Sequence, residues 1–184
     1  MAEVMPLEPG EALDASSLRT MLERAAGGAM PLHGRPFLGR LIVGAEDLSR
    51  LVPHANNVEY LRWIDRIAEL HADRLGHTRA RLLEGGRCFF VARHEVDYLA
   101  ECWEGETLLV ATWVRSMRKT TSWRDTLIVR PADGAAICRG STLWAFVDMQ
   151  TRRPARIPEA MIADFDPLDR GNGEAIASAE RTRP

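Results

Sequence analysis

The chain has 184 residues, of which 46% are hydrophobic and 27% are charged, a composition typical of one globular domain with a sizeable core. Its formal net charge is -2 and its isoelectric point is near 6.2, so we expect neither nucleic acid nor an anionic membrane as a partner. No stretch is long and apolar enough to span a bilayer, and the first residues lack the pattern of a signal peptide.

The cysteines Cys88, Cys102 and Cys138 are odd in number and scattered along the chain. They match neither a disulfide framework nor a zinc site. We therefore expect reduced thiols in a cytoplasmic protein and no metal.

Residues 1–36 are rich in Pro, Gly, Ala and Glu and are predicted to form an N-terminal extension. The stretch 14–24 within it is typical of a short helix that an Asp or Ser caps and that Gly27 and Gly28 end. A proline-rich linker follows. We therefore expect the main domain to begin with a strand at 37–43.

A long apolar helix is predicted to begin at Asn57 and to end near Leu75, where a glycine follows that suits the left-handed position after a helix. Its apolar residues form two stripes with spacings of three and four, which together cover more than half of its circumference. A helix this apolar must be covered by a sheet or by a partner chain. The remaining strip, with Asp65, Glu69 and Asp73, is expected to face solvent.

After residue 86 the pattern changes to that of β-strands, and the short connections favour a meander of four antiparallel strands. Together with the first strand they predict one sheet of about five strands curled around the helix. Such a sheet leaves an edge and an apolar surface that a symmetric dimer would cover. The tail at 159–184 is expected to cross the surface or to be disordered. The four predicted strands are residues 87–99, 107–117, 121–129 and 136–147.

The start of the long helix carries the most informative group of residues, since His54 precedes the adjacent asparagines Asn56 and Asn57. One asparagine can cap the helix with its side-chain oxygen, and the other can direct its amide elsewhere. The first-turn N–H groups and the positive end of the helix dipole would then stabilise an oxygen that develops negative charge. The simpler alternative is that both asparagines only cap the helix.

This part of the chain resembles the hotdog-fold acyl-CoA thioesterases of the 4-hydroxybenzoyl-CoA thioesterase type, whose helix start reads Gly-His-Val-Asn-Asn followed by Tyr-Leu-x-Trp. Residues 54–63 match that pattern except that Pro53 replaces the glycine and Ala55 replaces the valine. Further matches in family order are residues 91–99, 105–108, 133–148 and 151–158, so the resemblance covers 37–158.

The resemblance implies an α+β hotdog domain at 37–158, in which an antiparallel sheet of about five strands wraps around one long central helix. It also implies hydrolysis of an acyl-CoA or acyl-carrier-protein thioester to a free acid and a thiol. A catalytically inactive hotdog protein that binds acyl thioesters is the alternative from another class. A hotdog hydratase or dehydratase is a weaker one, because its arrangement of His and Asp is not found in the sequence.

The resemblance also implies the catalytic residues. The family places an Asp four residues before the His, whereas Arg50 occupies that position here. Asp47 could take over the catalytic role of that aspartate. Alternatively, the catalytic acid is lost, as the inactive alternative requires. Glu95 resembles a strand glutamate that some of these enzymes use as the catalytic acid, although it could instead pair with Arg93. His54 could orient water, bond to a carboxylate or only fix the loop. The predicted catalytic residues are therefore Glu95, His54, Asn57 and Asp47.

The phosphates of coenzyme A would need cationic partners, and guanidinium groups bind phosphate in a two-pronged fashion. Arg118 with Lys119, and Arg152 after the last strand, are the candidates, with ordinary solvated turns as the alternative. Thr121 and Ser122 could donate to the thioester or to the pantetheine arm, and Asn56 completes the predicted substrate-binding set. We expect no cofactor beyond the coenzyme A of the substrate and a homodimer or a dimer of dimers.

Overall fold

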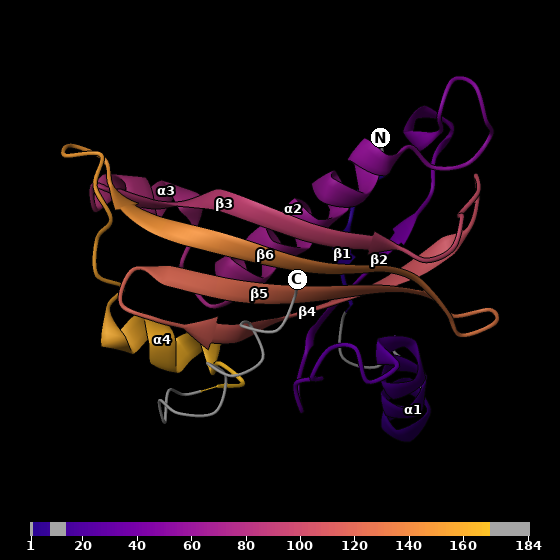
Figure 1. Cartoon of the computed structure of the whole chain (residues 1–184), viewed down its shortest axis with the longest axis horizontal. Helices are drawn as coiled ribbons and strands as arrows, with labels where there is room; N and C mark the ends of the chain where they lie inside the picture. The colour runs from indigo at the N-terminus through magenta and orange to yellow at the C-terminus, as the bar shows by residue number, and fades with distance from the viewer. Residues whose placement is uncertain (1, 8–13, 170–184) are drawn as a thin grey trace, which may run out of the picture.

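The structure is a computed structural model, and it describes residues 2–7 and 14–169. Its main feature is an antiparallel sheet of six strands that packs on the long helix α2 (Asn57–Arg74), which lies behind the sheet in Figure 1. The expected hotdog arrangement is confirmed, and a sixth strand arises because two residues pair with β2 as β1. The strands are β1 (Met5–Pro6), β2 (Phe37–Ile42), β3 (Arg87–Tyr98), β4 (Thr107–Met117), β5 (Thr121–Arg130) and β6 (Ala135–Asp148).

The order of the strands, β1-β2-β4-β5-β6-β3, corrects one expectation. The hairpins β4–β5 and β5–β6 form as predicted, but β3 pairs with β6 at the edge of the sheet and does not touch β4. The connection at 99–106 passes the start of α2 instead of making a tight turn, and Ala55 N donates to Cys102 O there at 2.9 Å. The predicted four-strand meander is therefore wrong in the position of β3, which was expected beside β4 and lies beside β6.

The helix α2 packs on what we call the inner face of the sheet. Its side chains Tyr60, Trp63, Ile64 and Ile67 are buried against apolar residues of β2, β4, β5 and β6. Removing one such side chain from water contributes on the order of 1.5–3 kcal/mol. The sheet lets the helix approach closely at Gly140, where an added Cβ would lie 2.7 Å from Cδ1 of Ile64.

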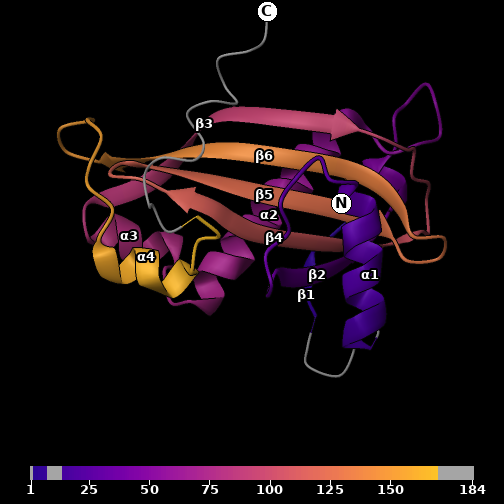
Figure 2. The same cartoon turned by 60° about the horizontal axis from the view of Figure 1, so that its bottom comes forward.

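The opposite, outer face is covered in part by the short helix α1 (Ala15–Ala26), which lies in front of the sheet in Figure 2. This helix was expected, and it is confirmed with Asp14 as its N-cap and Gly27 in the left-handed conformation at its end. It buries Leu22 against Trp113 and other apolar residues of β4 and β5. The N-terminal extension therefore contributes to the core.

Two further short helices were not expected. The helix α3 (Arg79–Glu84) precedes β3, and α4 (Glu159–Phe165) follows β6. Met161 and Phe165 of α4 are buried, so the part of the predicted tail that the structure describes packs on the domain instead of crossing its surface. The rest of that prediction, at 170–184, lies outside the described residues. None of the helices described is both long and apolar enough to cross a membrane.

Candidate functional site

The two asparagines at the start of α2 have different environments. Asn56 is the N-cap, and its Oδ1 accepts a hydrogen bond from Val58 N at 3.2 Å. Asn57 is the first helical residue and is exposed, and its side chain makes no hydrogen bond within the described part of the chain. Tyr98 donates its hydroxyl to the backbone oxygen of Asn57 at 3.2 Å, which ties the end of β3 to the helix start. One amide caps the helix and the other is open to a ligand.

His54 lies beside this helix start, and the edge of its ring faces Trp103 with 6.3 Å between ring centroids. Its Nδ1 is 2.9 Å from the carbonyl oxygen of Ala55. A carbonyl can only accept a hydrogen bond, so the proton of a neutral ring is assigned to Nδ1 and Nε2 is left as the acceptor. The ring can therefore take a proton from water at Nε2.

Asp47 is close to the helix start through its backbone, because its oxygen accepts from Asn56 N at 2.8 Å. Its carboxylate is fully buried and is engaged elsewhere. The two oxygens accept from Ala2 N at 3.0 and 2.9 Å, and one also accepts from Gly44 N at 2.9 Å. The geometry gives this side chain the role of anchoring the N-terminal segment, and its catalytic role stays a prediction.

Glu95 points away from the helix start. Its neighbour His94 faces α2 and bonds through Nδ1 to Oγ1 of Thr142 at 3.0 Å, and side chains alternate between the faces of a strand. Glu95 therefore lies on the outer face, where it forms an ion pair with Arg93 at 2.7 Å. The ion pair that the sequence offered as the alternative for Glu95 is thus present, and the catalytic role of Glu95 stays a prediction.

The outer face beyond Glu95 carries a compensated polar cluster. Asp125 is fully buried there, accepts from Ser141 Oγ at 2.7 Å and lies 3.6 Å from Arg115. Burial raises the pKa of Asp125, and the charge of Arg115 opposes that rise. The charges of Asp125 and Arg115 therefore pair, whereas Oδ2 of Asp125 is buried without a hydrogen-bond partner among the described residues.

An acidic residue that the sequence analysis passed over lies in the connection beside His54. Glu101 is exposed, and its side chain makes no hydrogen bond or ion pair within the described residues. It directly precedes Cys102, whose backbone oxygen holds Ala55. Glu101 lies near the start of α2 because the connection at 99–106 passes that helix start. A tight turn between β3 and β4, as the predicted meander required, would not have passed it.

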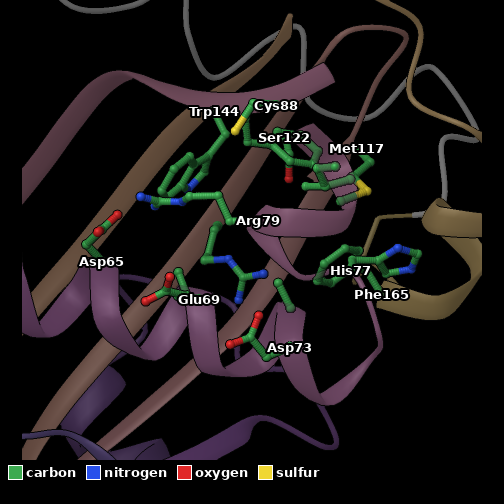
Figure 3. Close-up of a pocket in the computed structure, with 15 residues that line it drawn as sticks. Asp65, Glu69, Asp73, His77, Arg79, Cys88, Met117, Ser122, Trp144 and Phe165 are labelled. Atoms are coloured by element: carbon green, nitrogen blue, oxygen red, sulfur yellow. The ribbon is translucent and has the colours of Figure 1, made fainter. Parts of the chain in front are cut away.

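A small, mostly apolar cavity of about 70 Å³ lies at the other end of α2, between this helix, α3, α4 and the inner face of the sheet (Figure 3). Of the predicted substrate-binding residues, only Ser122 lines it. Asp65, Glu69 and Asp73 also line it, so the strip of α2 that was expected to face solvent borders a cavity instead. The apolar lining includes Ala68, Ala72, Leu82, Phe89, Met117 and Phe165.

The predicted phosphate partners lie in two turns at this same end of the sheet. Arg118 and Lys119 are exposed in the β4–β5 turn, and Arg118 pairs with Asp169 at 2.8 Å. Arg152 follows β6, and its guanidinium lies 5.8 Å from the ring centre of Phe90. Thr121, at the start of β5, is half-buried and pairs with Ala145 of β6.

The two turns are neighbours because the backbone N–H of Phe146 donates to Thr120 O at 2.8 Å. Asn57, by contrast, lies beside Tyr98 at the far end of β3. Within one chain, the structure brings the predicted basic residues near one another and near the cavity. It does not bring them to the start of α2.

Comparison with known proteins gives the family to which these features correspond. The model of the thioesterase-like superfamily matches residues 47–165. A chloroplast palmitoyl-acyl carrier protein thioesterase of Cuphea hookeriana is 29% identical over 119 residues, which are 65% of this chain and 28% of that protein. The chain therefore spans less than a third of the length of the curated relatives it matches.

Solved structures show the same fold at lower identity. A 1,4-dihydroxy-2-naphthoyl-CoA thioesterase from Synechocystis superposes with a TM-score of 0.65 at 16% identity, over 72% of this chain and 98% of that one. A 12:0-ACP thioesterase from Umbellularia californica superposes with a TM-score of 0.63 at 18% identity, over 76% of this chain and 55% of that one.

Proposed function

Because this chain belongs to the thioesterase-like superfamily, we propose that it hydrolyses an acyl thioester of coenzyme A or of acyl carrier protein to a free acid and a thiol. The observation that carries the proposal is the start of α2, which lies within the family match. The side-chain amide of Asn57 is exposed there and makes no hydrogen bond to any described residue. The relatives named above are thioesterases by name, and none of them supports the inactive alternative.

In the proposed reaction a water molecule attacks the thioester carbonyl carbon, and the carbonyl oxygen gains negative charge. The amide of Asn57 and the first-turn N–H groups of α2 stabilise that oxygen. Nε2 of His54 takes the proton of the attacking water, because Nδ1 is bonded to Ala55 O. The C–S bond then breaks, and the sulfur leaves as a thiol with the proton that Nε2 of His54 took from the water. We propose Glu101 in place of Glu95 as the carboxylate that polarises the water, since Glu95 faces the outer side of the sheet.

We further propose that the active unit is a homodimer joined through β3. One edge of this strand pairs with no strand of residues 2–7 and 14–169, and its large side chains are well exposed, with Phe90 at 41%, Val91 at 39% and Tyr98 at 45%. An open apolar edge favours pairing with another chain. Two antiparallel copies of β3 related by a two-fold axis would place the start of one strand beside the end of the other.

Such a dimer would complete the site. The cavity and the basic turns of one chain lie at the start of its β3, whereas Asn57 lies at the end of β3. Pairing would therefore bring the acyl cavity and the phosphate partners of one chain, Arg118, Lys119 and Arg152, toward the helix start of the other. Ser122 and Thr121 would then contact the acyl group or the pantetheine arm, and Asn56 would fix the helix start.

We propose that the protein acts in the cytoplasm and requires no cofactor beyond the coenzyme A of its substrate. The three cysteines are buried and free, which fits a reducing compartment. The cation that binds the substrate phosphates is supplied by arginine side chains in this proposal, so hydrolysis needs no added metal.

The test is thiol release from a panel of acyl-CoA and acyl-carrier-protein thioesters that are short, long and aromatic. We expect release from a subset of the panel, and we expect gel filtration to give a dimer. A folded dimer that releases no thiol from any member of the panel would contradict the proposal.

A further inference from the structure

A charged side chain lies inside the cavity without a counter-ion. Arg124 is on the inner face of β5, lines the cavity and is only 5% exposed. No carboxylate of the described residues lies within ion-pair distance of it, and burial lowers the pKa of its guanidinium to about 10. Burying a charge without a counter-ion lowers the stability of the fold, so a buried cation of this kind is a candidate for binding an anionic ligand.

One side of the guanidinium is used within the chain. Its Nη1 lies 2.9 Å from Nδ1 of His71 and 3.4 Å from Oγ1 of Thr112, and the group sits over the ring of Phe165. Burial, together with the charge of Arg124, lowers the pKa of His71 to about 3, so this imidazole is neutral and accepts the hydrogen bond. These contacts orient Arg124 but do not neutralise it.

The other side of the guanidinium is open. Nε and Nη2 make no hydrogen bond to any residue that the structure describes, and they are not among the fully enclosed polar atoms. This edge is the one that binds a carboxylate through two parallel hydrogen bonds.

Two more donors border the same cavity. Trp144 lies opposite Ser122 in the β5–β6 pair, and both line the cavity (Figure 3). The indole Nε1 of Trp144 is buried and has no partner in the described part of the chain. Buried polar groups are almost always hydrogen-bonded, and this indole N–H lacks an acceptor, as do those of Trp63 and Trp113 away from the cavity.

We propose that this cavity receives the far end of the acyl group and that Arg124 binds a carboxylate carried there. The substrates would then be thioesters of dicarboxylic acids and not of plain fatty acids, an inference that rests on the proposed function. The acids of α2 do not take the place of this ligand. Glu69 pairs with Arg66 at 2.8 Å, Asp73 is exposed, and the carboxylate of Asp65 lies beyond ion-pair distance of Arg124.

The inference can be tested by binding, separately from turnover. The probes are two thioethers of coenzyme A that cannot be hydrolysed, S-(5-carboxypentyl)-CoA and S-hexyl-CoA, measured by calorimetry on the full chain. We expect the carboxylated probe to bind about 10- to 100-fold more tightly, the range expected for hydrogen bonds between charged groups. Arg124→Met should remove that preference, and Arg124→Lys should restore only part of it because lysine cannot bind with two prongs.

Arg139→Met is the matched control, since Arg139 is a half-buried arginine on the outer face of β6, bonded to Ala25 O. It should leave the preference unchanged. If Arg124→Met does not fold, equal binding of the two probes to the unaltered protein is enough to overturn the inference, and a preference kept in Arg124→Lys at full size also overturns it.

The parallel assay compares hydrolysis of succinyl-, glutaryl- and adipyl-CoA with that of butyryl-, valeryl- and hexanoyl-CoA. Faster release from the carboxylated esters, lost in Arg124→Met, supports the inference. Equal hydrolysis of both series overturns the inference and leaves the proposed function intact. Preferential binding of the carboxylated probe without hydrolysis of any ester overturns the proposed function alone.

Discussion

The two faces of the sheet treat polar side chains in opposite ways. Asp125 and Arg124 are neighbours on β5, and both are buried. On the outer face, Asp125 has Ser141 and Arg115 around it. On the inner face, the partners of Arg124 among the described residues are a neutral histidine, a hydroxyl and the ring of Phe165.

This difference separates structural polar groups from functional ones. Buried polar groups that satisfy one another hold a fold together, and a buried group left with open hydrogen-bonding capacity needs a ligand or is costly. The charge of Asp125 has a partner on the outer face, whereas that of Arg124 has no carboxylate partner among the described residues. We therefore propose that the substrate binds on the inner face and at the start of α2. The predictions below test that contrast, in order of decreasing expected effect.

The carboxylates of the two faces provide the strongest contrast. Glu101→Gln should lower kcat by about 100-fold, because the attacking water loses the carboxylate that polarises it while His54 still accepts its proton. Glu95→Gln removes only an exposed pair with Arg93 and should leave kcat within about twofold. Steady-state thiol release with both variants measures this. If Glu95→Gln lost activity and Glu101→Gln kept it, Glu95 and not Glu101 would be the catalytic carboxylate.

The two asparagines provide the second contrast. Asn57→Ala should lower kcat by about 100- to 1,000-fold, as expected for loss of one donor to a developing oxyanion, with little change in the melting temperature. Asn56→Ala should instead lower the free energy of unfolding by about 1 kcal/mol through loss of the N-cap. Kinetics and thermal unfolding of both variants distinguish the roles, and a purely structural Asn57 would show the reverse pattern.

The His71–Arg124 contact predicts a pH dependence of stability. The folded-state pKa of His71, about 3, lies below its unfolded value of 6.5. The stabilisation from the neutral ring is therefore complete above pH 6.5 and is lost as the pH falls toward 3. The free energy of unfolding should fall by at most about 1.4 kcal/mol per pH unit in this window.

The variant His71→Gln keeps an acceptor for Arg124 but does not titrate. Urea unfolding between pH 7 and 4.5 should show a shallower pH dependence for this variant than for the unaltered protein. Parallel curves for the two proteins would exclude His71 as the source.

The basic turns give the smallest expected effect. Arg118→Glu should raise KM for acyl-CoA esters by about tenfold, the loss of one exposed charge-assisted contact, and should leave KM for short acyl-pantetheine esters unchanged. Arg152→Glu should act in the same direction. Equal changes in KM for both kinds of ester would show that neither residue meets the coenzyme A phosphates.

Much of the fold followed from the sequence because its signals are local. Asp14 and Asn56 cap the helices whose starts they were expected to mark, and Gly27 ends α1 as predicted. Strand limits were also close, since turn residues and apolar alternation depend on neighbours along the chain. The family resemblance identified the hotdog fold that the sheet and α2 confirm.

The sequence could not predict which face of the sheet a given strand residue occupies. Alternation fixes only which residues share a face, and register shifts between Val91 and Arg93 and between Val114 and Ser116 change even that pattern. Glu95 was predicted to be catalytic from its resemblance to a strand glutamate of the family, and alternation left its face open until the structure placed it on the outer face. The pairing of β3 with β6, which carries Glu101 past the helix start, is a long-range choice with no local signal.

The sequence by itself thus determined α1, the strands β2 to β6, the central helix and the two asparagines at its start, because caps, glycines and periodicity act over a few residues. It did not indicate β1, α3 or α4. Only the tertiary structure decided which charges are paired. Nothing in the sequence distinguishes Arg124 from the other arginines. It becomes a cavity cation without a counter-ion because residues 71 and 124, 53 positions apart, meet across α2 and β5, while no carboxylate of the described residues lies within ion-pair distance.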